Sequence, residues 1–249
     1  MARQNSSSFE HNTQQKATRL EHSSQQAVHI GHVPLPPELV EACMRRVEGK
    51  PLEGFLAGFG KWPGDIMLVG EAPGGNEIVQ GRPFCGQAGK VLDEYLQIAG
   101  ITRDDLYMTS AVRSRPYRDR PVKGNPERIS RSNRTPTASE ILAHAPILDY
   151  ELSVVKPRLL LTVGNIGLQR LLGGGVRVSD IHGQPRQSTI RHVDRDHPER
   201  GYTEGTEQYW IFPLYHPAAI LYNRSLESVI EQDLHRLRDF LQKEEWISG

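Results

Sequence analysis

The sequence has few of the features that mark membrane or secreted proteins. It contains only two cysteines, Cys43 and Cys85, which excludes a disulfide framework. No apolar run approaches the roughly 20 residues that a membrane helix needs, and the N-terminus lacks the apolar core of a signal peptide. We therefore expect a cytoplasmic protein with no membrane partner.

The chain also has no net charge, since 30 Lys and Arg balance 30 Asp and Glu. This balance argues against nucleic-acid binding, which depends largely on Lys and Arg. The distribution is uneven, however, because residues 113–134 hold seven Arg and one Lys against Asp119 and Glu127. The segment has several prolines and no apolar period, so we expect a long loop. It is either a clamp for the DNA backbone or a solvated surface loop.

The 249 residues suit one α/β domain with a polar extension. Residues 1–34 are rich in Ser, Gln, Asn and His, and we expect a disordered or loosely attached tail there. The domain would then span residues 35–249. Four apolar runs alternate with helical patterns, which predicts a parallel sheet. These runs are residues 66–69, 106–112, 158–163 and 209–215.

The first apolar run leads into a glycine-rich stretch that lacks both common phosphate-loop spacings. Counted from Gly70 as the first position, the third position is Ala72 and not glycine, and Val91 follows Gly89-Lys90 where a Walker loop needs Ser or Thr. The stretch instead offers the carboxylate of Glu71, a rigid turn at residues 73–75, a second carboxylate and the aromatic ring of Phe84. These groups suit a flat, mostly uncharged ligand.

Three polar residues lie at the ends of predicted strands, namely Glu71, Ser110 and His216. The carboxyl ends of parallel strands share one edge of a sheet, where such folds bind their ligands. We therefore expect these residues to meet in one crevice. A second polar group, His192, Asp194, Asp196 and His197, is interpreted as a solvated hairpin tip and not as a metal site.

Two separated motifs resemble those of family 4 uracil-DNA glycosylases. They are Gly70-Glu71-Ala72-Pro73-Gly74, continued by Gly81-Arg82-Pro83-Phe84 and Gly86-Gln87-Ala88-Gly89, and His216-Pro217-Ala218-Ala219-Ile220-Leu221. The resemblance runs from about Cys43 to the C-terminal helix. It implies a three-layer α/β/α sandwich with a central, mainly parallel four-stranded sheet. It also implies a monomeric enzyme that flips a deaminated base, chiefly uracil, out of DNA and hydrolyses its N-glycosidic bond.

The resemblance assigns roles to positions of this sequence. Glu71 and His216 would be catalytic, with Glu71 orienting water and His216 donating to the departing base. Ala72, Gly74, Phe84 and Ser110 would bind the base. Arg113, Arg115, Leu221, Asn223 and Arg224 would contact DNA, with Leu221 as the wedge that fills the gap.

Two departures from the family pattern leave alternatives open. Ser110 stands where the family has the asparagine that binds uracil, so the preferred base could be hypoxanthine or xanthine, or the protein could bind DNA without cutting it. A nucleotide-binding domain unrelated to repair is a third alternative. Cys43, Arg46, Ser114 and His144 stand where the family has four cluster cysteines, so we expect no iron–sulfur cluster and no metal.

Overall fold

A computed structural model describes residues 27–246, which are built around a seven-stranded sheet in the order β1-β3-β5-β4-β8-β12-β9. Four inner strands run parallel: β5 (Leu106–Ser110), β4 (Ile66–Gly70), β8 (Leu159–Val163) and β12 (Tyr209–Leu214). Antiparallel strands extend both sides: β1 (His29–Gly31), β3 (Phe59–Trp62) and β9 (Arg186–Ser188). The predicted α/β class and parallel centre are confirmed, but the prediction of four strands is wrong. The edge strands are short and only partly apolar, so no buried run marks them.

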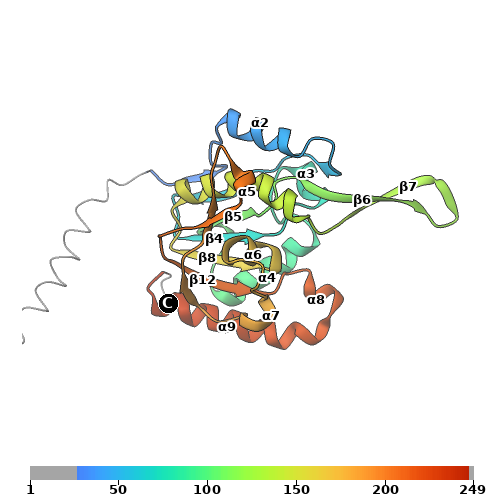
Figure 1. Cartoon of the computed structure of the whole chain (residues 1–249). Coiled ribbons are helices and arrows are strands. Elements are labelled where there is room, and N and C mark those ends of the chain that lie inside the picture. Colours follow the sequence, from blue (N-terminus) through green and yellow to red (C-terminus); the bar gives the residue numbers. More distant parts are fainter. Residues whose placement is uncertain (1–26, 247–249) are drawn as a thin grey trace, which may run out of the picture.

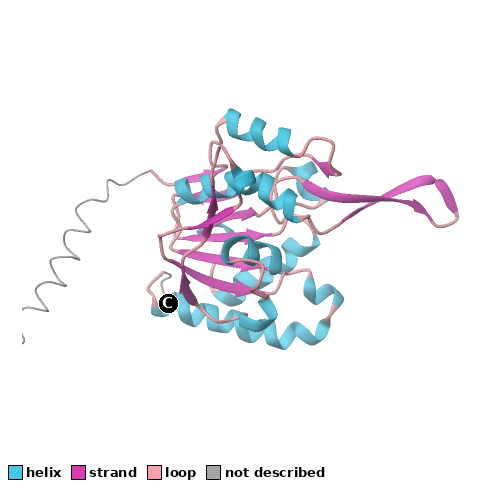
Figure 2. Cartoon of the chain, in the orientation of Figure 1, coloured by secondary structure: helices cyan, strands magenta, loops and turns pink. Residues whose placement is uncertain are grey.

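Helices cover both faces of this sheet and make three layers (Figures 1 and 2). One face carries α4 (Gln87–Ala99) and α9 (Glu227–Lys243), and the other carries α5 (Ala138–Val155) and α6 (Asn165–Leu172). Side chains of β4 alternate between the two layers. Ile66 and Leu68 pack in the α4 and α9 core, whereas Met67 and Val69 pack in the α5 and α6 core.

The remaining elements are short and lie around these layers. They are the helices α2 (Pro37–Arg46), α3 (Gly75–Gln80), α7 (Val178–Ile181) and α8 (Ala219–Tyr222), and the hairpin of β10 (Arg191–Val193) with β11 (Tyr202–Glu204). Helix α2 packs on α5 through Leu39, Cys43 and Ile147. The polar group of His192, Asp194, Asp196 and His197 is the one that we expect to hold no metal. In it, the side chain of Asp194 accepts hydrogen bonds from the backbone N–H groups of Asp196 and His197, which is a turn-forming role.

The basic segment is a β-hairpin and not a long loop. Strands β6 (Arg115–Val122) and β7 (Asn125–Asn133) pair antiparallel and project from the body of the molecule (Figure 1). At its base β6 also pairs with β2 (Leu52–Glu53). Prolines misled the prediction, because a strand of an isolated ribbon has a free edge where a missing N–H costs little. A register shift at Pro121 accommodates one of them.

The predicted tail falls mostly on residues 1–26, which lie outside the described residues. Its end is built into the fold, since β1 pairs with β3 and Val33 is buried. The folded part therefore begins before the predicted boundary at residue 35. Within residues 27–246, no helix is both long and apolar enough to cross a membrane.

Candidate active site

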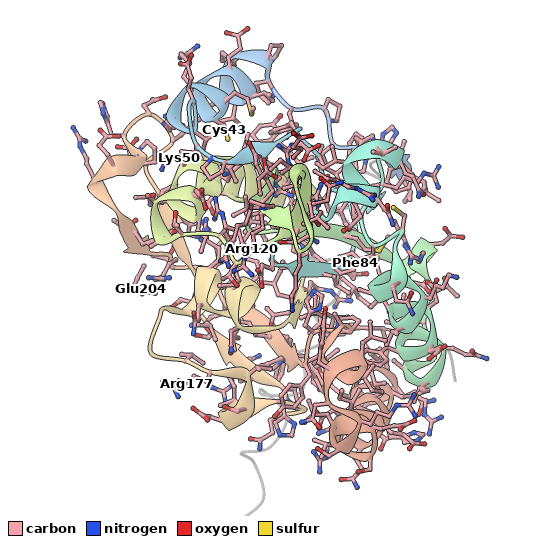
Figure 3. The ribbon with its side chains drawn as sticks, turned by 90° about the vertical axis from the view of Figure 1, so that its right-hand side faces the viewer. Cys43, Lys50, Phe84, Arg120, Arg177 and Glu204 are labelled. Carbon is pink, nitrogen blue, oxygen red and sulfur yellow. The ribbon has the colours of Figure 1, made fainter. Side chains whose placement is uncertain are left out.

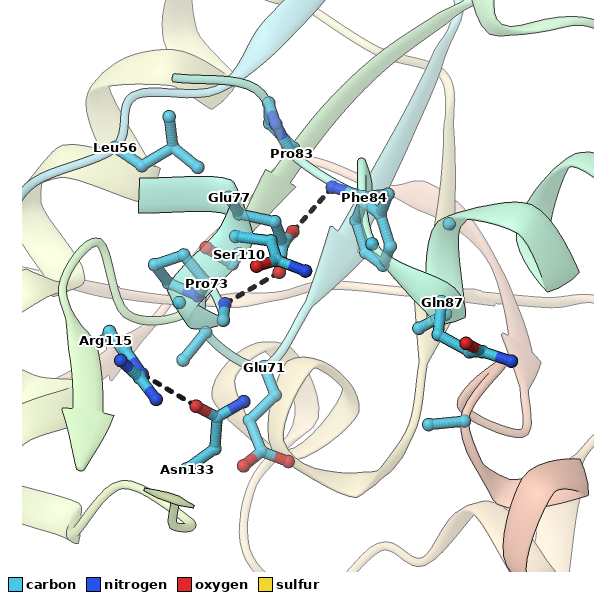
Figure 4. Close-up of a pocket in the computed structure, with 18 of the residues that line it drawn as sticks. Leu56, Glu71, Pro73, Glu77, Pro83, Phe84, Gln87, Ser110, Arg115 and Asn133 are labelled. Atoms are coloured by element: carbon cyan, nitrogen blue, oxygen red, sulfur yellow. Dashed lines mark hydrogen bonds between the residues drawn. The ribbon is translucent and has the colours of Figure 1, made fainter. Parts of the chain in front are cut away.

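A cavity of about 410 Å³ opens at the carboxyl edge of the parallel strands (Figure 4). Its size is within the range of small-molecule sites. The predicted residues that line it are Glu71, Ala72, Gly74, Phe84, Ser110, Arg113, Arg115, His216 and Leu221. Because they come from β4, β5, β6 and β12 and from the turns that follow, the sheet brings together groups that are far apart in sequence.

Glu71 follows β4 directly and its carboxylate faces the cavity (Figure 4). Its backbone is fixed, since its carbonyl accepts the N–H of Val112 at 3.0 Å. No Lys, Arg or His of the described residues lies within ion-pair distance of the carboxylate, and burial raises its pKa. Glu71 is thus a desolvated carboxylate with free lone pairs, which suits the binding of water or of a developing positive charge.

His216 follows β12, and a backbone hydrogen bond selects one tautomer of its neutral ring. Its Nδ1 accepts the N–H of Ala218 at 3.1 Å, so in the neutral ring the proton is on Nε2. Burial lowers the pKa of the imidazole, which favours this neutral form. The ring can therefore donate one hydrogen bond from Nε2 without carrying a charge.

Phe84 forms an aromatic wall of the cavity and is only 7 % exposed. Its backbone has φ of 52°, a conformation that non-glycine residues rarely adopt. Two contacts hold it there: its N–H donates to Glu77 at 2.5 Å, and its carbonyl accepts from Arg103 at 2.7 Å. The ring lies so close to Gly70 that a Cβ there would be 2.8 Å from it. The rigid placement of the ring suits stacking on a flat ligand.

Glu77, the second carboxylate of the loop, has a structural role. One oxygen accepts the N–H of Gly74 at 2.7 Å and the other accepts that of Phe84 (dashed lines in Figure 4). The carboxylate therefore ties the two halves of the loop together. Its oxygens are occupied, which leaves Glu71 as the carboxylate available to a ligand.

Ser110 ends β5 beside Gly70 and lines the cavity. Its hydroxyl donates to the carbonyl of Val112 at 2.7 Å. Because a hydroxyl has one proton and two lone pairs, Ser110 can offer a ligand only an acceptor while this bond is made.

Comparison with known proteins decides the family. A model of the uracil DNA glycosylase superfamily matches residues 57–240, which is most of the chain and includes every residue of the cavity just described except Leu56. The chain belongs to this superfamily. The resemblance seen in the two motifs is thereby confirmed.

Curated relatives of this superfamily member are named type-4 uracil-DNA glycosylases. One from Sulfurisphaera tokodaii is 33 % identical over 177 residues, which cover 70 % of this chain and 69 % of the relative. One from Saccharolobus solfataricus is 31 % identical over 205 residues, covering 81 % and 83 %. A third from Thermotoga maritima is 28 % identical over 214 residues, covering 83 % and 95 %.

Arg113, a predicted DNA contact, lies in the inner wall of the cavity and not at the surface. Its side chain is 0 % exposed and donates to the buried carboxylate of Glu151 at 2.7 Å. Glu151 also accepts from Thr109 at 2.6 Å, from Tyr107 at 3.1 Å and from the backbone of Gly58 at 2.8 Å. Arg113 thus belongs to a buried polar network behind the cavity of this glycosylase-superfamily chain.

The other predicted DNA contacts lie at the surface. Arg115 and Leu221 line the cavity, and Leu221 is 46 % exposed. Asn223 and Arg224 are exposed beyond α8 but do not line it. The Oδ1 of Asn223 accepts the N–H of Ser225 at 3.1 Å, so this side chain caps a short turn.

Asn133 and Tyr222 are among the polar or aromatic residues of the cavity that sequence reasoning missed. Asn133 lines it from the end of β7, where its Oδ1 accepts from the Nε of Arg115 at 2.7 Å (Figure 4). Tyr222 lines it from α8 and is 90 % exposed. Tyr222 directly follows the second motif, so its position was a usable signal. Asn133 had none, because only the pairing of β6 with β7 returns it to the cavity.

The residues at the family's cluster positions do not fit an iron–sulfur cluster. Burial raises the pKa of Cys43 to about 11, so the thiol stays protonated and packs with Leu39 and Ile147. His144 gives its Nδ1 proton to the carbonyl of Glu140 at 2.8 Å, and its Nε2 accepts from Ser114 at 3.3 Å. Burial lowers the pKa of His144 to about 4. One protonated thiol and an already satisfied Ser–His pair are not a thiolate ligand set.

Proposed function

We propose that this chain is a DNA glycosylase of base excision repair that removes a deaminated base, chiefly uracil, by hydrolysing its N-glycosidic bond. One observation carries the proposal: Glu71, His216 and Phe84 face the same cavity at the carboxyl edge of the sheet. The curated relatives, which are named uracil-DNA glycosylases, support it. The substrate is DNA. Its target nucleotide must be flipped out of the helix, because a base that is still stacked in the duplex cannot enter the cavity.

In the proposed reaction the bond between C1′ of the sugar and the base nitrogen breaks, and its electron pair leaves with the base. Glu71 stabilises the positive charge that develops on the sugar and orients a water molecule toward C1′. The water oxygen then bonds to C1′ and its proton passes to the Glu71 carboxylate. Burial supports this role, because a desolvated carboxylate interacts more strongly with a charge than a solvated one.

The departing base carries the electron pair as an anion, which His216 stabilises by a hydrogen bond from Nε2 to a carbonyl oxygen. The N–H of Ala218 supports this assignment, because it occupies Nδ1 and leaves Nε2 as the donor. The base anion then takes up a proton from solvent. Phe84 stacks on the flipped base and recovers part of the stacking lost in the duplex. The backbone of Ala72 holds the edge of the base, whereas Gly74, the other predicted contact, has its N–H bound by Glu77 and its carbonyl bound by the N–H of Ile78.

Ser110 supports discrimination between a deaminated pyrimidine or purine and its amino parent in two cases. Its hydroxyl proton is engaged by Val112, so it presents an acceptor to the base. Uracil and hypoxanthine each have a ring N–H at the position where cytosine and adenine have a lone pair. An acceptor pairs with the ring N–H and repels the lone pair, and such a buried mismatch can dominate selectivity. The argument keeps hypoxanthine as a substrate beside uracil; it does not separate xanthine from guanine or uracil from thymine, which share the ring N–H.

We further infer that the protein holds no iron–sulfur cluster and acts as a monomer in the cytoplasm. The satisfied Ser114–His144 pair and the protonated Cys43 support the first point. The resemblance to family 4 enzymes implies the monomeric state. The free thiols of Cys43 and Cys85 fit a reducing compartment.

The test is base release from oligonucleotides that carry uracil, hypoxanthine or xanthine, with cytosine and adenine as the matched undamaged bases. We expect release of deaminated bases only. Glu71→Gln should lower kcat by about 10²–10⁴, and His216→Ala should lower it by about 10²–10³. Ser110→Ala should lower kcat/KM by roughly tenfold to a hundredfold, because it removes one acceptor.

Lys156→Gln is the matched control, because this exposed residue lies at the other edge of the sheet, just before β8. It should release bases like the wild type. Binding of DNA by the wild type without release of any of the three bases would overturn the enzyme and leave a DNA-binding protein on the same fold.

A further inference from the structure

The hairpin of β6 and β7, here called the arm, starts at the cavity and leads away from it. Arg115 at the start of β6 and Asn133 at the end of β7 both line the cavity. The strands then project from the same side of the molecule as α3 and α8 (Figure 1). Figure 3 looks onto this side and shows Arg120 of the arm and Phe84 of the cavity on it. A DNA strand seated at the cavity would therefore pass the arm.

Strand pairing divides the arm into two faces of different charge. Residues directly paired across the ribbon share a face, and faces alternate along each strand. Arg118 pairs with Ser132 and Arg120 with Ser130, so two arginines lie on one face opposite two small side chains. All four of these residues are exposed.

On the opposite face of the arm, the positive charge of Arg131 is already paired. Arg131 lies over the ring of Tyr117 at 3.8 Å and pairs with Asp119 at 2.8 Å and Glu53 at 3.4 Å. Arg118 and Arg120, in contrast, have no carboxylate within ion-pair distance among residues 27–246. The face of Arg118 and Arg120 is therefore the cationic face of the arm.

We propose that the arm lies along double-stranded DNA on one side of the flipped nucleotide, with Arg118 and Arg120 on phosphates. This inference rests on the proposed function, which places the flipped nucleotide in the cavity. Phosphate contacts fix position without reading sequence. The serines opposite the arginines are small, so the DNA backbone can approach the ribbon closely. Because of the arm, the enzyme requires duplex DNA on one side of the flipped nucleotide, the side where the arm lies.

Strand geometry sets the reach of the arm. At about 3.3 Å per residue, Arg118 and Arg120 lie roughly 10 and 17 Å beyond Arg115. Measured along the helix axis of duplex DNA, successive phosphates of one strand are ~3.4 Å apart. The contacts therefore fall about three and five base pairs from the flipped nucleotide, and a flank of two base pairs is too short to reach them.

The first experiment measures binding of the full chain to an undamaged 20-base-pair duplex by fluorescence anisotropy over a range of salt concentrations. Each lost phosphate contact lowers the slope of log affinity against log salt by about 0.9. The double variant Arg118→Gln/Arg120→Gln should thus lower the slope by about 1.8. The control Lys156→Gln/Lys243→Gln removes two exposed charges near the opposite edge of the sheet and should leave the slope unchanged.

The second experiment uses duplexes with a hydrolysis-resistant deoxyuridine analogue and flanks of two or eight base pairs on either side. Lengthening the flank on the side of the arm, but not the other flank, should strengthen binding of the wild type. It should not strengthen binding of the arginine double variant. An equal gain from both flanks, or the same gain on single strands, would overturn the proposal. So would an unchanged salt slope.

The two proposals fail separately. If the wild type releases no base but the double variant still loses salt dependence, the arm binds DNA and the glycosylase function is wrong. If the wild type releases uracil and the double variant binds duplex with the same salt slope, the function stands and the arm has no part in it. Circular dichroism should show equal folding, because both arginines are exposed.

Discussion

The guanidinium of Arg113 donates to the carboxylate of Glu151 at 2.7 Å, and both side chains are 0 % exposed. The pair joins the chain just after β5 to the C-terminal part of α5. Thr109, the neighbour of Ser110, donates to the same carboxylate. A buried ion pair of this kind therefore holds the strand end that carries Ser110 in place.

Glu151→Gln should destabilise the fold by about 3–5 kcal/mol, because it leaves the Arg113 guanidinium buried without its counter-charge. Urea denaturation measures this free energy of unfolding. The matched control is Asp65→Asn, which breaks the Arg158–Asp65 pair, also at 2.7 Å but more than half exposed. An exposed pair contributes about 0–1 kcal/mol. Equal losses from the two variants would contradict the central role of the buried pair.

The fall of kcat/KM at acid pH should occur at a pH above the usual pKa range of a carboxyl group. Glu71 must be ionised to act, and burial raises its pKa, so kcat/KM should fall at a higher pH than for an exposed glutamate. The pKa of His216 is lowered by burial, which favours the neutral ring that the proposed reaction uses. The measurement is kcat/KM against pH; a limb at or below the ordinary carboxyl pKa would refute the role of Glu71.

The same shift has a consequence for stability. A carboxyl whose pKa is raised by folding is penalised when ionised, and this penalty is present above its folded pKa and absent below its unfolded pKa. Glu71→Gln should therefore raise Tm at neutral pH, and the gain should shrink as the pH falls. Thermal melts of the wild type and variant at several pH values check this, and a gain that persists in acid would point to another cause.

The purified protein should contain no iron and show no absorption band from a cluster. Base release should survive prolonged treatment with an iron chelator. Cys43→Ala should keep the activity, because the thiol is protonated and only packs in the core. Iron at about four atoms per chain, with activity lost on its removal, would show that a cluster is held by other means.

The sequence predicted the parallel centre of the sheet because each central strand is a continuous apolar run, and the signal for such a strand is local. The ends of those runs then placed Glu71, Ser110 and His216 at one edge, and the structure lines one cavity with all three. The outer strands β1, β3 and β9 escaped prediction since they are short and mostly half-buried or exposed, and so have no continuous apolar run.

Local patterns, in short, determined what each segment becomes: the strands, the helix that begins with the Thr137–Glu140 capping box, and the glycine-rich loop. Tertiary structure alone decided what each charge does. Arg113 and Arg118 are the same residue type in the sequence. Arg113 is nevertheless buried against Glu151, 38 residues away, whereas Arg118 is exposed on the arm. The reason is physical: the electrostatic environment of a side chain is set by neighbours that folding brings from distant parts of the chain.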